Sequence, residues 1–106
     1  MTFNEYQEKA LRTANEVGSR LMLNGALGLC GEAGETADII KKHFFQGHEL
    51  DKEELKKELG DVMWYLAILA FSAHIDLDDV ARENIEKLKR RYPNGFSADR
   101  SVNREE

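Results

Sequence analysis

The feature of this sequence that most constrains its fold is an uncharged run of twelve residues, 62–73, which reads "VMWYLAILAFSA". Asp51 and Glu54 have the spacing of a capping motif, so this run forms the second half of a predicted helix at about 52–74. That half is apolar on every side, and it is too short to cross a bilayer. The sequence therefore predicts a helix that is buried all round, in the middle of a helical bundle.

Helical periodicity also runs through the rest of the chain, in which Pro93 is the only proline. Thr2 and Glu5 have the spacing of a capping box at the start of a first helix, and Gly47 is a suitable residue to end a second one. Residues 18–24 are expected to form a break between these two helices. The predicted helices cover about 3–17, 25–45, 52–74 and 77–91.

No segment alternates in the manner of a β-strand, so the predicted fold is all-α, a bundle of about four helices. The 106 residues form one domain by size, which we place at residues 1–96, and residues 97–106 are a polar C-terminal tail. The apolar run at 62–73 could seal the core of one subunit or lie in an interface between subunits.

Charge and cysteine content restrict the partners and the compartment. The net charge is −5, so the surface as a whole repels nucleic acid, and only residues 87–91, "KLKRR", form a basic stretch. Cys30 is the single cysteine, so no intrachain disulfide forms. Residues 1–10 contain acids and no apolar core of the kind found in signal peptides. We therefore expect a cytoplasmic protein that binds neither nucleic acid nor a membrane.

Residues 25–35, "GALGLCGEAGE", combine four glycines with two acids. A helix-interior glycine costs about 0.8–1 kcal/mol relative to alanine, so part of this segment is a loop, or close helix packing needs the missing side chains. A helical wheel places Gly28 on one face with Glu32 and Glu35, where it leaves room for something bulky to approach. The expected packing stripe lies on another face and consists of Leu29, Ala33, Ala37, Ile40 and Phe44.

The third predicted helix carries a second acidic pair, Glu58 and Asp61, at the threshold of the apolar run. An acidic pair on a helix is usually a solvated surface, but this one adjoins a segment that needs cover. Antiparallel packing on the second helix would bring the two pairs together. Four converging carboxylates repel one another unless cations neutralise them, and ligands that are all oxygen favour Mg²⁺, with Mn²⁺ as a substitute.

The fourth predicted helix adds positive charge beside an apolar stripe that we expect to face inward. Asn84, Lys87 and Arg91 form one strip of this helix, and the apolar stripe consists of Val80, Ala81, Ile85 and Leu88. Basic residues at the end of a helix also suit its dipole, which is the simpler interpretation. Acids that hold a metal, together with cations and an amide, are typical of a pocket for a polyphosphate.

The segments "GEAGE" and "ELGDVMWYL", followed by "NIEKLKRRYPNGF", resemble the signature of the MazG-like nucleotide pyrophosphohydrolases. The resemblance implies an all-α enzyme, assembled as a homodimer or homotetramer, that hydrolyses a nucleoside or deoxynucleoside triphosphate between the α and β phosphates. A Mg²⁺-activated water would attack, and the products would be a monophosphate and pyrophosphate. By position, the catalytic metal ligands are Glu32, Glu35, Glu58 and Asp61. The implied substrate-binding residues are Lys42, Tyr65, Asn84, Lys87 and Arg91.

One alternative is a non-catalytic helical bundle that binds a nucleotide or a protein partner without turnover. Such a module has no need of four carboxylates with metal-ligand spacing, which favours the enzyme. Residues 18–24, a candidate region for base selectivity, match nothing diagnostic. The sequence therefore leaves the preferred nucleotide open.

Overall fold

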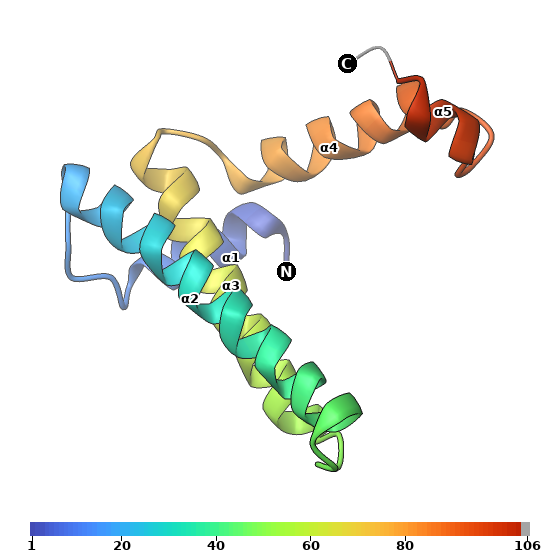
Figure 1. Cartoon of the computed structure of the whole chain (residues 1–106). Helices are drawn as coiled ribbons and strands as arrows, with labels where there is room; N and C mark the ends of the chain where they lie inside the picture. Colours follow the sequence, from blue (N-terminus) through green and yellow to red (C-terminus); the bar gives the residue numbers. More distant parts are fainter. Residues whose placement is uncertain (105–106) are drawn as a thin grey trace.

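The computed structural model describes residues 1–104, which fold into helices and connecting turns with no β-strand among them. The helices are α1 (Phe3–Leu11), α2 (Gly18–Phe45), α3 (Lys52–Ser72), α4 (Leu77–Arg91) and α5 (Ala98–Val102). Figure 1 shows α2 and α3 as a long antiparallel hairpin, with α1 near its open end and α4 leading away from it. The all-α prediction is confirmed, and the third and fourth helices end within two residues of their predicted limits.

The helix ends follow the local sequence where polar caps are present. The Thr2 side chain accepts a hydrogen bond from the Glu5 amide, and the Glu5 carboxylate accepts one from the Thr2 amide. Asp51 accepts from the amides of Glu53 and Glu54 at the start of α3. Gly47 follows α2 with φ 71°, in the left-handed region that favours glycine. These caps use neighbours in the chain, so the sequence is enough to predict them.

The boundary between the first two helices differs from the prediction. Helix α1 ends at Leu11 rather than near residue 17, and residues 18–24, the expected break, form the first two turns of α2. The indole of Trp64 donates to the Ala10 carbonyl at 3.0 Å and to the Thr13 hydroxyl at 2.9 Å, at the point where α1 ends. A contact with a residue more than fifty positions away thus ends α1, and sequence periodicity does not reveal it.

One buried glutamine joins three helices. The Gln7 amide nitrogen donates to the carbonyls of Ala67 and Ile75, and its oxygen accepts from the amide of Leu77 at the start of α4. Asn4 accepts from the next α4 amide, that of Asp78. Two side chains of α1 therefore satisfy amides of α4 that have no partner within the helix, and they tie α1, α3 and α4 into one junction.

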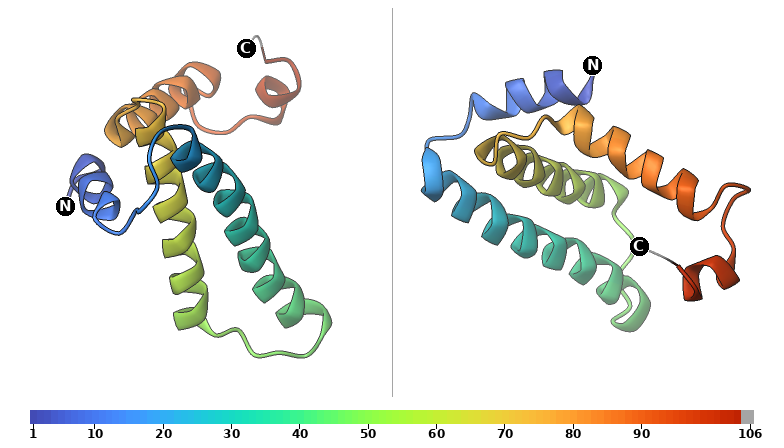
Figure 2. Two further views of the ribbon diagram at one scale, coloured as in Figure 1. Left: turned by 90° about the vertical axis from the view of Figure 1, so that its left-hand side faces the viewer. Right: turned by 90° about the horizontal axis from the view of Figure 1, so that it is seen from above.

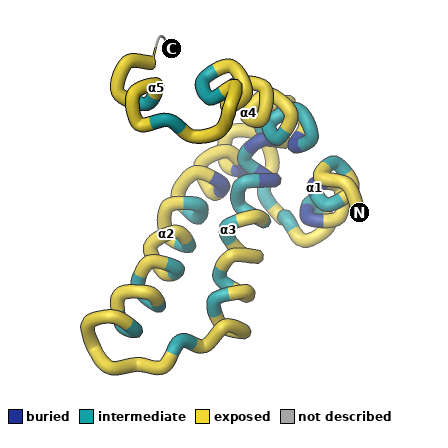
Figure 3. The backbone as a smooth tube through the Cα atoms, turned by 90° about the vertical axis from the view of Figure 1, so that its right-hand side faces the viewer, coloured by how far each residue is buried: buried dark blue, intermediate teal, exposed yellow. Residues whose placement is uncertain are grey.

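The core of the chain lies at this junction and is small. Its buried members are Ala10, Ala67, Ala70 and Leu77, and partly buried Tyr6, Trp64, Leu66 and Val80 pack against them. Figure 3 shows buried residues gathered at this end of the hairpin and exposed ones over most of α2, α4 and α5. The junction therefore provides most of the burial in the chain.

The chain is more open than a closed bundle. Its radius of gyration is 16.7 Å, against about 13 Å for a compact domain of this length. Its accessible surface is 8020 Å², against about 6,000 Å² for a folded monomer of its mass. Met63 and Phe71 in the apolar half of α3 are 38% and 48% exposed, so the expectation of burial on every side is wrong for the single chain. Met63 borders a cavity between α1, α3 and α4, and Phe71 borders another between α1, α2 and α3.

Helix α4 also differs from the prediction in its outer half. Ile85 is 50% exposed and Leu88 is 37% exposed, so these two residues do not face a core within the chain. Residues 98–102 of the predicted polar tail form α5, and the Arg100 side chain donates to the carbonyls of Arg90 and Arg91 at the end of α4. Residues 105–106 of that tail lie outside the described residues. No helix within residues 1–104 combines the length and apolar character that a bilayer span needs.

Candidate active site

Two glycines let α2 approach α3 closely. A Cβ atom at Gly25 would lie 2.9 Å from the Leu69 Cβ and 3.0 Å from its Cα, and a Cβ atom at Gly28 would overlap the ring of Tyr65. The close-packing interpretation of the glycine-rich segment is therefore confirmed for these two positions. The space beside Gly28 is filled by Tyr65, so it does not remain open for a ligand as the helical wheel suggested. Gly31 and Gly34 face open space.

The face of α2 that packs on α3 is therefore not the predicted stripe. Ala33 and Ala37 are exposed, Ile40 is 36% exposed and Phe44 is 72% exposed. Of that stripe, only Leu29 is half-buried. The wheel correctly grouped the residues of each face, but it could not tell which face meets α3. The glycine face packs because it allows the closer approach, and the apolar stripe is left uncovered in the single chain.

The glycine packing brings acids from both helices together. One carboxylate oxygen each from Glu32, Glu58 and Asp61 can be chosen so that all three lie within 4.8 Å of one another. Glu32 and Glu58 are half-buried and Asp61 is exposed. Carboxylate oxygens bind Mg²⁺ at about 2.0–2.1 Å, so three oxygens this close can surround one small divalent ion after slight side-chain adjustment. The residues present fit such an ion.

The fourth predicted ligand, Glu35, is exposed and lies outside this group of three. It lines an adjacent polar cavity of about 300 Å³ together with Glu58, Glu54, Asp38 and Lys42. The Lys42 ammonium is 3.0 Å from the Asp38 carboxylate. A hydrogen bond to Asp38 and that residue's charge raise the pKa of Lys42, and the charges of Glu35 and Glu54 add to the effect. Lys42 is thus a cation among carboxylates beside the acidic group.

The carboxylates disturb one another electrostatically. A hydrogen bond with Glu32 raises the pKa of Glu58, and burial and the charges of Glu32 and Asp61 raise it further. Burial, followed by the charge of Asp61, raises the pKa of Tyr6 on the facing helix α1. Negative charge thus accumulates between α2 and α3, close to Tyr6 of α1, and a cation bound there would relieve it.

Tyr65 lies one helical turn beyond Asp61, next to the acids. Its ring is half-buried against Gly28, and the ring of Trp64 meets it edge-on with 5.0 Å between the ring centroids. The family resemblance implied a substrate-binding role for Tyr65, but the sequence did not identify Trp64 as its support. Trp64 is held by a hydrogen bond to Ala10 of α1, a residue distant in the sequence, so local patterns do not indicate this support.

The predicted basic strip is not near the acids within this chain. Asn84, Lys87 and Arg91 lie on α4, which packs on α1 and α3, and Figure 2 shows its outer half diverging from the α2–α3 hairpin. Asn84 lines a largely apolar cavity of about 270 Å³ with Phe3 and Met63. The structure brings three of the four acids together and places the strip elsewhere.

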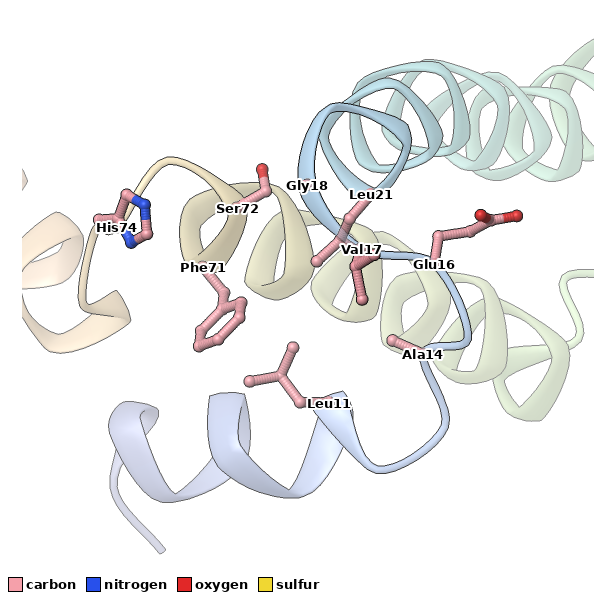
Figure 4. A pocket seen from close by; sticks show the side chains of 9 residues that line it. All are labelled: Leu11, Ala14, Glu16, Val17, Gly18, Leu21, Phe71, Ser72 and His74. Carbon is pink, nitrogen blue, oxygen red and sulfur yellow. The ribbon is translucent and has the colours of Figure 1, made fainter.

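A larger cavity, of about 350 Å³, lies at the open end of the hairpin (Figure 4). Leu11, Leu21 and Phe71 contribute apolar side chains from three different helices, and Glu16 and His74 are at its edge. Leu21 precedes Glu32 by eleven residues, which is about 16 Å along a helix. This cavity is therefore separate from the acids and lacks a cluster of charged groups.

Comparison with known proteins identifies the family that carries this acidic arrangement. Residues 23–96 match the model of the MazG nucleotide pyrophosphohydrolase domain. The chain belongs to the MazG nucleotide pyrophosphohydrolase family. The matched region contains all four acids, Tyr65 and the basic strip of α4. The resemblance described from the sequence is therefore confirmed.

Relatives of this MazG-family chain come from a phage, a mammal and a bacterium. It is 40% identical over 73 residues to the gene 37 protein of Mycobacterium phage L5, which covers 65% of this chain and 64% of that protein. It is 33% identical over 76 residues to the dCTP pyrophosphatase 1 of Mus musculus, which covers 66% of this chain and 45% of that protein. It is 34% identical over 73 residues to the uncharacterized protein YvdC of Bacillus subtilis, covering 60% and 69%.

The chain thus spans less than two thirds of the length of the phage and mouse relatives. No solved structure gives a significant match to the chain.

Proposed function

We propose that this MazG-family chain is a hydrolase that cleaves nucleoside or deoxynucleoside triphosphates between the α and β phosphates, releasing a monophosphate and pyrophosphate. The observation that carries the proposal is the group formed by Glu32, Glu58 and Asp61, contributed by two helices. Glu32 and Asp61 raise the pKa of Glu58, because carboxylates this close repel one another when all are ionised. Such a group is unfavourable in a simple binding surface, and it is suited to holding a cation.

Mg²⁺ is the proposed cofactor, with Mn²⁺ as a substitute, because the ligand atoms offered are all oxygen. Glu32, Glu58 and Asp61 would hold the ion. Glu35 lies on α2 three residues after Glu32, and it would either join these ligands or accept a proton from the attacking water. When bound, the ion would supply a water of lowered pKa and offset charge on the phosphates. The Lys42 ammonium, fixed by Asp38, is positioned to attract a phosphate oxygen from the adjacent polar cavity.

The proposed working form is a homodimer or homotetramer. The single chain exposes about 2,000 Å² more surface than expected for its mass, and a standard interface takes about 800 Å² from each partner. Its uncovered apolar residues include Phe44 on α2, which is 72% exposed, and Ile85 on α4, which is 50% exposed. Association would cover these faces. It would also allow the strip of Asn84, Lys87 and Arg91 on one subunit to face the acids of another and to bind the phosphate chain.

The proposed substrate class is supported by the family and by the similarity to dCTP pyrophosphatase 1 of Mus musculus. We therefore include dCTP first in a panel of the four deoxynucleoside and four ribonucleoside triphosphates. Pyrophosphate release by the purified protein is measured with Mg²⁺, with Mn²⁺ and with EDTA. We expect metal-dependent release of one pyrophosphate for each monophosphate formed. Release of inorganic phosphate instead would contradict cleavage between the α and β phosphates.

The alternative is a module that binds a nucleotide or a protein without turnover. The same panel separates the two functions when equilibrium binding is measured alongside hydrolysis. Nucleotide binding with no product from any triphosphate, in either metal, would favour the binding module over the enzyme.

A further inference from the structure

The ring of Tyr65 is held from two sides by residues that do not belong to the acidic group. Gly28 of α2 lies against the ring so closely that a methyl group at this position would overlap it. The Trp64 ring meets it edge-on, with 5.0 Å between centroids and 86° between ring planes. Trp64 is itself fixed by its hydrogen bonds to Ala10 and Thr13 at the end of α1. The Tyr65 ring is therefore confined directly by α2, and by α1 only through Trp64.

The hairpin also changes character on the two sides of the acidic group. Toward the α2–α3 turn lies the polar cavity, whose lining includes Glu35 and Lys42. Toward the junction lies Tyr65, one turn from Asp61, against Gly28, one turn from Glu32. A nucleotide has two corresponding ends: a charged phosphate chain, and a nucleoside whose flat base stacks on aromatic rings. The polarity of the hairpin therefore matches a ligand whose phosphate chain lies toward the polar cavity and whose nucleoside lies toward Tyr65.

We infer that Gly28 is a positioning residue for the nucleoside end of the substrate: by leaving space for the Tyr65 ring, it fixes the surface against which the sugar or base lies. This inference rests on the proposed function, because it takes a nucleotide to be the ligand. A side chain at position 28 displaces the ring from α2 and misplaces this surface, while Glu32, Glu58 and Asp61 keep their places on the two helices. Gly25 differs, because its neighbour is the Leu69 main chain and it sets the helix spacing.

The chain offers a matched control three residues away on the same helix. A Cβ atom at Gly31 meets nothing within 4 Å, so Gly31→Ala makes the same chemical change as Gly28→Ala without displacing a neighbour. For both variants and the parent protein, hydrolysis is measured to separate KM from kcat. Equilibrium binding is measured for dAMP, dCMP, dGMP and TMP, and separately for inorganic pyrophosphate with Mg²⁺. Helix content and oligomeric state are compared in the same samples.

We expect Gly28→Ala to raise KM and to weaken binding of the preferred monophosphate at least fivefold. Its binding of inorganic pyrophosphate stays within twofold of the parent, because that ligand has no nucleoside. Gly31→Ala stays within twofold for both ligands. A helix distortion would weaken both ligands together, so the split between the two ligands identifies action through Tyr65.

The coupling to Tyr65 is tested in the Tyr65→Ala background, where no ring remains to be displaced. There, Gly28→Ala should have no further effect on monophosphate binding, and any loss of thermal stability should also disappear. Trp64→Phe, which keeps a ring but removes the hydrogen bonds to α1, should weaken monophosphate binding in the same direction by a smaller factor. The Trp64→Phe variant tests the placement of the Tyr65 ring even if the Gly28→Ala protein does not fold.

Three results overturn the inference. Gly28→Ala could match Gly31→Ala in monophosphate binding, its effect could persist undiminished in the Tyr65→Ala background, or the parent could bind no monophosphate. If the parent protein hydrolyses triphosphates in either of the first two cases, the inference about Gly28 fails and the proposed function stands. A parent that binds monophosphates with the expected split but releases no pyrophosphate loses the proposed hydrolysis and keeps the positioning role of Gly28.

Discussion

The α2–α3 hairpin and the outer half of α4 are both amphipathic helical segments, yet the chain treats them differently. The hairpin packs on itself through Gly25 and Gly28 and presents acids at the line of contact. The outer half of α4 carries cations and leaves Ile85 and Leu88 half-exposed. The glycine face of α2 finds its partner within one chain, whereas the apolar side of the outer half of α4 is uncovered, as is the stripe of α2 that includes Phe44. Local periodicity therefore defines the apolar face of a helix, but it does not determine which surface covers that face.

The largest expected effect concerns the hairpin. Glu58→Ala removes a carboxylate that fits the metal ion, so we expect Mg²⁺-dependent turnover to fall at least about a hundredfold, the scale of losing one preorganised electrostatic group. Circular dichroism should show unchanged helix content, because Glu58 supports no core contact. Glu53→Ala, at an exposed position in the first turn of the same helix, is the control and should keep full activity. Turnover retained by the Glu58 variant would remove this residue from the site.

The next prediction concerns the uncovered side of α4. The double substitution Ile85→Glu and Leu88→Glu places charge on two half-exposed apolar positions and should shift the protein to monomers in light scattering. Loss of about 2 kcal/mol of apolar burial weakens association roughly thirtyfold. Glu83→Ala, at an exposed polar position of the same helix, is the control. An unchanged oligomer in the double variant would show that this side of α4 is not an interface.

A smaller effect is expected for one cation of the strip. Lys87→Ala should weaken triphosphate binding about tenfold, the scale of one charge-assisted contact, and monophosphate binding by less. The comparison is made by titrating a non-hydrolysable triphosphate analogue and the matching monophosphate. Equal losses for the two ligands would mean that Lys87 does not contact the phosphate chain.

The junction between the two regions contains a residue in a strained backbone conformation. His74 lies two residues beyond the end of α3 with φ 61°, and the amides of His74 and Ile75 donate to the carbonyls of Phe71 and Ala70, respectively. Only glycine adopts this conformation without cost, so His74→Gly should raise the free energy of unfolding by about 1 kcal/mol. Gly47→Ala, at φ 71° after α2, should lower it by a similar amount in the same thermal melts. A destabilised His74→Gly protein would show that the imidazole makes contacts worth more than the strain.

The smallest effect is a pH dependence of the metal-free protein. The pKa of Glu58 is raised above its usual 4.5 in the folded state, so the folded protein keeps a proton there that the unfolded chain has lost. Stability in EDTA should therefore fall as pH rises from about 4.5 through the raised pKa, and stay lower above it. Glu58→Gln should remove this fall and be the more stable protein at neutral pH without metal. Mg²⁺ should stabilise the parent and not the variant.

The sequence was sufficient where the cause is local. The Thr2–Glu5 capping box, the Asp51 cap and the shared face of Gly28 and Glu32 all depend on residues within one or two turns. The approach of Glu32 to Glu58 and Asp61 also followed, because the two helices that carry them are joined by a short turn. These features give the all-α fold and three of the four acids in one place.

The sequence was insufficient where the cause is a distant partner. The end of α1 depends on Trp64, and the filling of the space at Gly28 depends on Tyr65. Neither contact leaves a periodic signal. The exposure of Ala33, Ala37 and Phe44 shows the same limit, since an apolar stripe looks identical whether it meets the chain's own helix or another subunit.

Trp64 is placed where an intrinsic fluorophore can report on both α1 and the acidic site. It is the only tryptophan in the chain, and it joins α1 to the tyrosine beside the acids. Its intrinsic fluorescence is therefore a natural, label-free reporter. Undocking of α1 would change the emission by exposing the indole to water, and ligand occupancy would change it through the adjacent ring, so one spectroscopic signal follows both events in the unmodified protein.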